Sequence, residues 1–154
     1  MDSDDAFAGC CHVPHGCVFT KALQSRIADC VHATRRSVGE ATALDCLSPP
    51  AQANCQLLAA LLHERARFAL KLGAGGQPLR HVQALRLQCG GLLALQRQLG
   101  PASPGGTPAR VACVHGLVGQ AQARHGSLTE LPWPQLVADL ARWAPRQRAT
   151  GRAP

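Results

Sequence analysis

Eight cysteines in a chain of 154 residues are the side chains best suited to chemistry. Thiolates bind zinc, copper and iron–sulfur clusters, and pairs of thiols take part in redox reactions. The first twenty residues lack the apolar run of roughly 7–15 residues that a secretory signal needs. We therefore expect a cytoplasmic protein whose thiols stay reduced. In that setting cysteines serve as ligands, redox groups or small core residues rather than as a disulfide framework.

Four of these cysteines are candidate ligands of one centre. Cys30, Cys55 and Cys89 each fall on or beside the apolar stripe of a different predicted helix, and Cys46 lies in the segment that leads into the second of these helices. Four thiolates are what an iron–sulfur cluster or a structural zinc ion requires. The sequence therefore predicts such a centre, with an iron–sulfur cluster preferred. No Cys-x-x-Cys motif occurs, so separate buried thiols in the core and a redox pair stay open as alternatives.

A second group of possible ligands lies near the N-terminus. Cys10, Cys11, His12, His15 and Cys17 place five soft or borderline donors within eight residues, which suits zinc or copper. Two adjacent cysteines are awkward ligands for one ion, and the spacing matches no zinc finger. The hypothesis is a weak or transfer-type metal site, and the alternative is a tail that binds no metal.

The elements that would position these side chains are predicted from the periodicity of apolar residues. Helical spacing runs from Thr20 to about Arg36, from Ser48 to Gly73, after Pro78 to Gly100, from Thr107 to His125, and from Leu131 to Pro145. Residues 37–47 are expected to form a loop with a short extended piece near Leu44. These segments predict an all-α fold, a single-domain bundle of about five helices.

The predicted domain organisation has three parts. Residues 1–17 form a flexible, Cys- and His-rich arm, residues 18–145 form the helical domain with a Gly/Pro linker at 100–108, and residues 146–154 form a basic tail. Gly90 and Gly91 interrupt the third helix at a cost of about 1 kcal/mol each relative to alanine. Such glycines indicate the close approach of a neighbouring element or a ligand.

Composition limits the possible functions. The net charge of +7 suits a nucleic-acid-associated regulator that uses Arg35, Arg36 and the C-terminal arginines, but aromatic residues that could stack on bases make up only 3%. No run of about 18 apolar residues predicts a membrane span. No nucleophile–base trio or phosphate loop predicts an enzyme.

These observations predict a small cytosolic protein that binds metal or an iron–sulfur cluster. Its expected role is electron transfer, metal or cluster supply, or redox sensing, and a protein partner is expected. The first alternative is a metal-free helical adapter or assembly factor. The second is the nucleic-acid-associated regulator.

Overall fold

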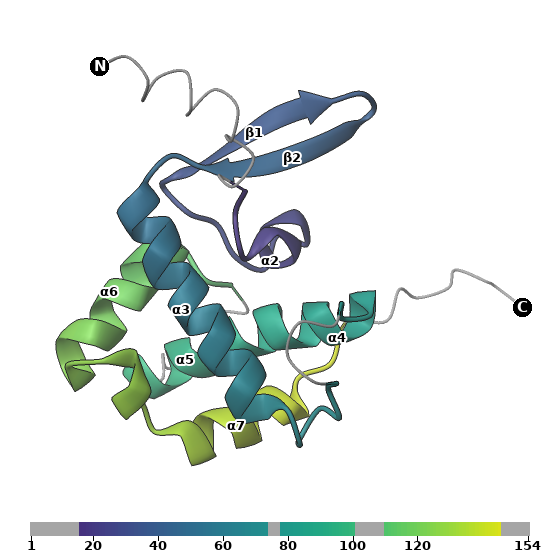
Figure 1. Ribbon diagram of the computed structural model, residues 1–154. Helices are drawn as coiled ribbons and strands as arrows, with labels where there is room; N and C mark the ends of the chain where they lie inside the picture. The colour runs from purple at the N-terminus through teal and green to yellow at the C-terminus, as the bar shows by residue number, and fades with distance from the viewer. Residues whose placement is uncertain (1–15, 74–77, 101–109, 146–154) are drawn as a thin grey trace, which may run out of the picture.

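The computed structural model describes residues 16–73, 78–100 and 110–145. A group of helices packs around an apolar core, and a β-hairpin and one short helix stand at one end of this group (Figure 1). The α-helices are α2 (Thr20–Gln24), α3 (Pro49–Ala66), α4 (His81–Leu85), α5 (Gly91–Leu99), α6 (Val114–His125) and α7 (Trp133–Arg142). A π-helical turn (Arg86–Gly90) joins α4 to α5, and a 3₁₀ turn (Leu128–Glu130) precedes α7.

The expectation of an all-α fold is wrong, although the chain is mostly helical. Strands β1 (Ala33–Val38) and β2 (Ala41–Cys46) pair antiparallel. They occupy the end of the helix expected from Thr20 and the loop expected at 37–47. The first helix stops at Gln24 because Arg26 adopts a left-handed backbone conformation, with φ of 65°, which an α-helix cannot continue.

A two-residue turn closes the hairpin. Gly39 and Glu40 connect the strands, and Gly39 has φ of 63°, as the first central residue of a type II′ turn requires. Arg36 and Asp45 form an ion pair across the two strands, with 2.7 Å between Nε and Oδ2. The segment before α2 joins the free side of β2, because the Cys17 amide donates to the Leu44 carbonyl at 2.9 Å.

Helix α3 begins where the sequence predicts. The Ser48 hydroxyl accepts a hydrogen bond from the Ala51 amide at 3.2 Å, and prolines occupy the first turn, where a missing amide hydrogen costs nothing. The helix ends at Ala66 rather than at Gly73. Turns follow it, and Lys71 takes a left-handed conformation with φ of 56°.

The predicted close approach at Gly90 and Gly91 is confirmed, and the neighbour is the protein itself. A Cβ atom on Gly91 would lie 2.8 Å from both δ-methyl groups of Leu62 in α3. On Gly90 it would lie 3.2 Å from the Leu140 carbonyl oxygen and from the Trp143 Cβ atom. These two glycines let α3 and α7 pack directly against the π-helical turn and α5.

Helix α6 starts later than the sequence predicts. It begins after Cys113, whereas the prediction placed its start at Thr107, which lies outside the described residues. Val111, which the predicted helix included, is instead extended and forms a bridge with Ala28. Gly126, with φ of 81°, ends the helix as expected.

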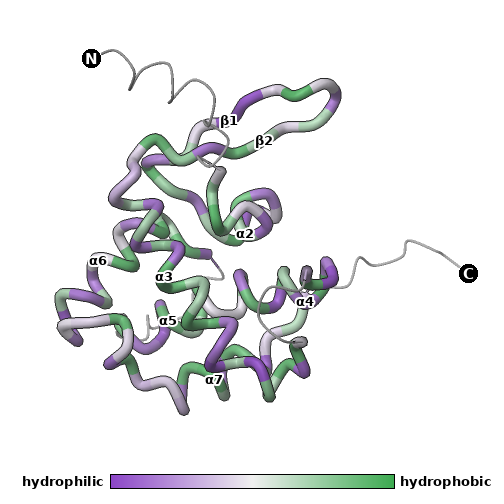
Figure 2. The backbone as a smooth tube through the Cα atoms, in the orientation of Figure 1, coloured by the Kyte–Doolittle hydropathy of each residue, from purple (hydrophilic) through white to green (hydrophobic). Residues whose placement is uncertain are grey.

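The core lies between α3, α5, α6 and α7. Its largest fully buried side chains include Phe19, Leu58, Leu92, Val118 and Leu136. Apolar and polar residues are interleaved along these helices (Figure 2), as expected where one face of a helix is buried. None of the helices in the described part of the chain combines the length and apolar character needed to cross a membrane.

Candidate thiol site

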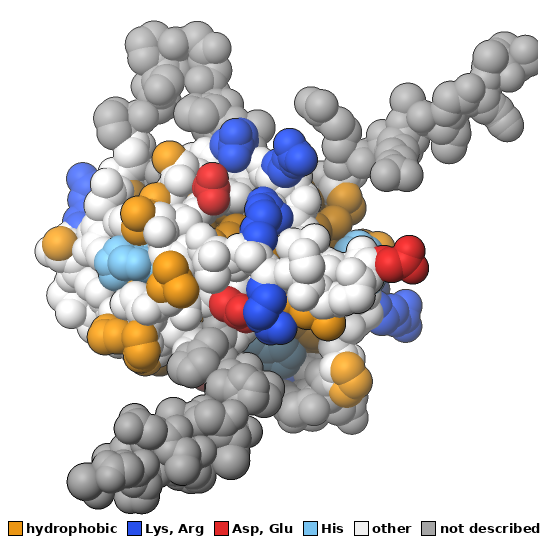
Figure 3. Space-filling model, turned by 90° about the horizontal axis from the view of Figure 1, so that it is seen from above, with side chains coloured by type: hydrophobic (Ala, Val, Ile, Leu, Met, Phe, Trp, Pro, Cys, Tyr) orange, Lys and Arg blue, Asp and Glu red, His pale blue; other side chains and the backbone are white. Residues whose placement is uncertain are grey.

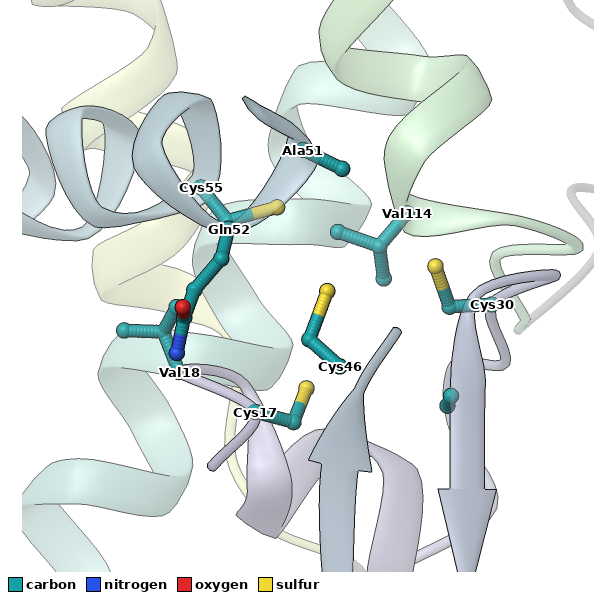
Figure 4. A pocket seen from close by; sticks show the side chains of 9 residues that line it. Cys17, Val18, Cys30, Cys46, Ala51, Gln52, Cys55 and Val114 are labelled. Atoms are coloured by element: carbon teal, nitrogen blue, oxygen red, sulfur yellow. The ribbon is translucent and has the colours of Figure 1, made fainter. Parts of the chain in front are cut away.

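Four cysteines from four separate segments line one pocket (Figure 4). Cys17 precedes α2, Cys30 precedes β1, Cys46 is the last residue of β2, and Cys55 lies in the second turn of α3. We call this site the four-thiol pocket. Its remaining wall consists of Val18, Ala33, Ala51, Gln52 and Val114.

Local structure places each thiol at this point. The hydrogen bond from the Cys17 amide to Leu44 fixes the first cysteine beside β2. The Cys46 thiol donates to the Ser48 carbonyl at 3.3 Å, immediately before α3. Cys55 is on the buried side of α3, with 8% of its surface exposed. The hairpin, the segment before α2 and the N-terminal turns of α3 therefore all contribute to one site.

The electrostatics of the pocket favour neutral thiols when no cation is bound. Burial raises the pKa of Cys17 and Cys30. It also raises the pKa of Cys55 to about 12, and the other thiolates of the pocket add to this shift by charge repulsion. A bound metal ion or cluster would reverse this balance, because its positive charge stabilises the ligating thiolates.

The pocket is narrow. Its cavity measures about 10 Å³, close to the space that one water molecule needs. Among the described residues, no group of three or more His, Cys, Asp or Glu side chains is arranged to hold a single metal ion. Binding of a metal centre would therefore require the cysteine side chains to reorient around it.

A fifth thiol, that of Cys113, adjoins the pocket next to Cys30. Cys113 is the N-cap residue of α6, and the Val31 amide donates to its sulfur at 3.5 Å. Burial alone would raise the pKa of Cys113. Hydrogen bonds from the amides of Val31, Gly116 and His115 and from the Cys30 thiol outweigh burial, so this pKa lies below its ordinary value.

The structure brings together three of the four cysteines that the sequence grouped. Cys30, Cys46 and Cys55 line the pocket, but Cys89 does not, because it lies in the π-helical turn with no exposed surface. Its sulfur is 3.5 Å from the Ser25 hydroxyl, away from the other thiols. Cys17, which the sequence assigned to the N-terminal metal group, occupies the fourth place.

The other donors of the N-terminal group, Cys10, Cys11, His12 and His15, lie outside the described residues. The hypothesis of a separate site in the arm stays a prediction. Cys17 is the one member of that group that the structure describes, and it points to the four-thiol pocket. Cys113 was missed altogether. The sequence carried no signal for it, because the predicted helix began at Thr107 and placed Cys113 inside the helix rather than at its start, where backbone amides face the side chain.

On the hairpin end of the molecule several of the described Lys and Arg side chains lie near one another, and they share this surface with other side-chain types (Figure 3). Seen from above, Lys and Arg side chains are interspersed with acidic, apolar and His side chains (Figure 3). Arg36, one of the two adjacent arginines considered for nucleic-acid binding, pairs with Asp45.

Comparison with known proteins gives no match: no family model fits the chain, and neither a curated protein nor a solved structure is significantly similar to it.

Proposed function

We propose that the four-thiol pocket binds an iron–sulfur cluster and that the protein acts in electron transfer, in cluster or metal supply, or in redox sensing. The observation that carries this proposal is the meeting of Cys17, Cys30, Cys46 and Cys55 around one pocket. Cysteine can pack in a core as a small apolar residue, but here four cysteines distant in sequence adjoin one another. Four thiolates match the ligand requirement of a cluster.

The described residues hold no compact ligand set for a single ion. This favours a cluster, around which the thiols would have to move apart from the present cavity of about 10 Å³. Zinc–sulfur bonds of about 2.3 Å hold the four sulfur atoms of a tetrahedral site roughly 3.8 Å apart. No three ligand side chains of the described residues are gathered in that way. In a cubane cluster each thiolate binds a different iron atom, so the protein sulfurs stand further apart. None of the described residues that line the pocket carries an imidazole or a carboxylate, which also suits a cluster.

The test is metal analysis of the full chain purified without oxygen. We expect iron and acid-labile sulfide in similar amounts and broad visible absorbance. The variants Cys17→Ser, Cys30→Ser, Cys46→Ser and Cys55→Ser should each lose most of the bound iron. Cys89→Ser is the matched control, because it changes a buried cysteine outside the pocket and should keep its iron.

The outcomes separate the proposal from its alternatives. Folded protein that contains neither iron nor zinc, even after chemical reconstitution, would refute it and favour the metal-free adapter. Equal iron loss in Cys89→Ser and in the pocket variants would also refute it. Stoichiometric zinc that is lost only in the pocket variants would keep the metal site and replace the cluster by zinc.

A protein partner and a cytoplasmic location are further parts of the proposal. Val31 and Leu47 directly follow two of the pocket cysteines and are 73% and 67% exposed. The Leu47 amide donates to the His32 carbonyl at 2.8 Å, so these apolar side chains flank the same end of the hairpin. Exposed apolar groups beside a metal centre suit docking of a partner. The described cysteines are all free, as a reducing compartment would keep them.

A further inference from the structure

We propose that Cys30 and Cys113 form a dithiol pair that closes to an intramolecular disulfide on reaction with a small-molecule disulfide, and that closure withdraws Cys30 from the four-thiol pocket. The pair itself does not depend on a metal. The second half of the inference, release of the metal centre, rests on the function proposed above.

The two cysteines lie on segments that run side by side. Ala28 and Val111 form a parallel bridge, in which the Val111 amide donates to the Ile27 carbonyl at 2.7 Å. Further along the same two segments, the Val114 amide donates to the Asp29 carbonyl at 2.9 Å. Neighbouring positions of two hydrogen-bonded segments meet the Cα separation of about 4.4–6.8 Å that a disulfide requires.

The two thiols lie near each other at this place. The amide of Val31, the residue after Cys30, donates to the Cys113 sulfur at 3.5 Å, and the Cys30 thiol is near enough to influence the pKa of Cys113. The rings of His32 and His115 continue the alignment, edge to face with centroids 4.7 Å apart. We expect a disulfide at this place to form by rotation of the two cysteine side chains.

Ligand number sets Cys113 apart from the pocket thiols. Cys113 is half-buried, as are Cys17, Cys30 and Cys46, whereas Cys55 and Cys89 are 8% and 0% exposed. A four-ligand centre leaves Cys113 unused, so its sulfur stays available while the pocket is occupied. We assign Cys113 as the attacking sulfur, because the Val31 amide donates a hydrogen bond to it and would stabilise its thiolate. Cys30 is then the resolving sulfur.

The reaction balances with a disulfide of the glutathione type as oxidant. The Cys113 thiolate attacks one sulfur of the oxidant, the sulfur–sulfur bond breaks, and the first thiolate leaves and takes up a proton. The Cys30 sulfur then attacks the Cys113 sulfur of the mixed disulfide, loses its proton and releases the second small thiol. Two protein thiols are oxidised and one small disulfide is reduced to two thiols.

The first test uses the reduced, metal-free full chain. It is incubated with oxidised glutathione, alkylated and mapped by mass spectrometry. We expect a Cys30–Cys113 cross-linked peptide as the main product, its absence from Cys113→Ser and Cys113→Ala, and its retention in Cys89→Ser. Circular dichroism of each variant checks that it folds. A main cross-link among Cys17, Cys46 and Cys55, or Cys113 still alkylated after the other thiols have reacted, would overturn the pair.

The second test uses the metal-loaded chain and the same oxidant. Iron release should be at least tenfold slower from Cys113→Ser than from the wild-type chain, while Cys89→Ser should match the wild type. Equal release from all three would overturn the link between the pair and the metal. If no preparation binds metal but the Cys30–Cys113 cross-link forms, the proposed function fails and the dithiol pair stands.

Discussion

Selective alkylation tests the electrostatics of the thiol site directly. The reduced, metal-free chain would be treated with brief pulses of iodoacetamide at about pH 8, and labelling of each cysteine would be followed by mass spectrometry. Only the thiolate reacts, so the rate follows the fraction ionised. In the folded chain burial and neighbouring thiolates raise the pKa of Cys55 to about 12, whereas Cys113 has its pKa lowered by hydrogen bonds from backbone amides.

The magnitude follows from these values. At about pH 8 an ordinary thiol with a pKa near 9 is roughly one-tenth ionised, and a thiol with a pKa near 12 is ionised about a thousandfold less. A thiolate of higher pKa is more nucleophilic, which offsets part of this difference, so we expect Cys55 to react more than about tenfold more slowly than Cys113. In concentrated urea the two rates should converge, which provides the control for intrinsic reactivity. If the labelling rate of Cys55 in the folded chain were within about tenfold of that of Cys113, the claim that burial and charge repulsion raise the pKa of Cys55 would be refuted.

Further predictions concern the stability of the fold. Gly91→Ala should lower the free energy of unfolding by up to about 2 kcal/mol in urea denaturation, because the clash with Leu62 at 2.8 Å outweighs a helix-propensity gain of about 1 kcal/mol. The matched variant Gly119→Ala should raise it by about 0.5–1 kcal/mol, since a Cβ atom there meets nothing within 4 Å. Ser48→Ala should cost about 1 kcal/mol through loss of the helix cap. The metal-free chain should lose stability as the pH rises from about 9 towards about 12, because the unfolded state releases the Cys55 proton that the folded state retains; a pH series of unfolding curves, with Cys55→Ser as control, checks this.

Local sequence signals predicted some elements of the fold correctly, but they did not predict the β-hairpin. Ser48 before two prolines specifies a helix start through local chemistry alone, and the structure confirms it. The hairpin also had a local signal, a glycine at the first of two residues between Val38 and Ala41. The helical spacing of Leu23 and Ile27 masked it. Periodicity alone does not reveal that the chain turns at Arg26, where the backbone takes a left-handed conformation.

The ligands of the site could be predicted from the sequence only in part. A cysteine on the apolar stripe of a helix is expected to be buried, but burial does not distinguish a metal ligand from a thiol that only packs in the core. Cys89 satisfies that criterion and packs in the π-helical turn, whereas Cys17 has no stripe and still reaches the pocket. What brings Cys17 there is pairing of its backbone with β2, of which the sequence predicted only a short extended piece near Leu44. The meeting of the pocket cysteines therefore depends on the β-hairpin, which the periodicity of apolar residues did not reveal.

The position of the hairpin supports a cross-linking role for the pocket. In β1 and β2 only Leu44 is fully buried, so the hairpin adds little to the apolar core and has little hydrophobic reason to stay against the helices. Cys46 at its base, Cys30 before it and Cys55 on α3 meet where the two parts of the molecule join. A metal centre held by these thiols would link the hairpin to the helical core through metal–sulfur bonds. These bonds would take the place of apolar contacts that the hairpin does not make. Because such a centre binds only the folded arrangement, its binding free energy would add to the stability of this junction.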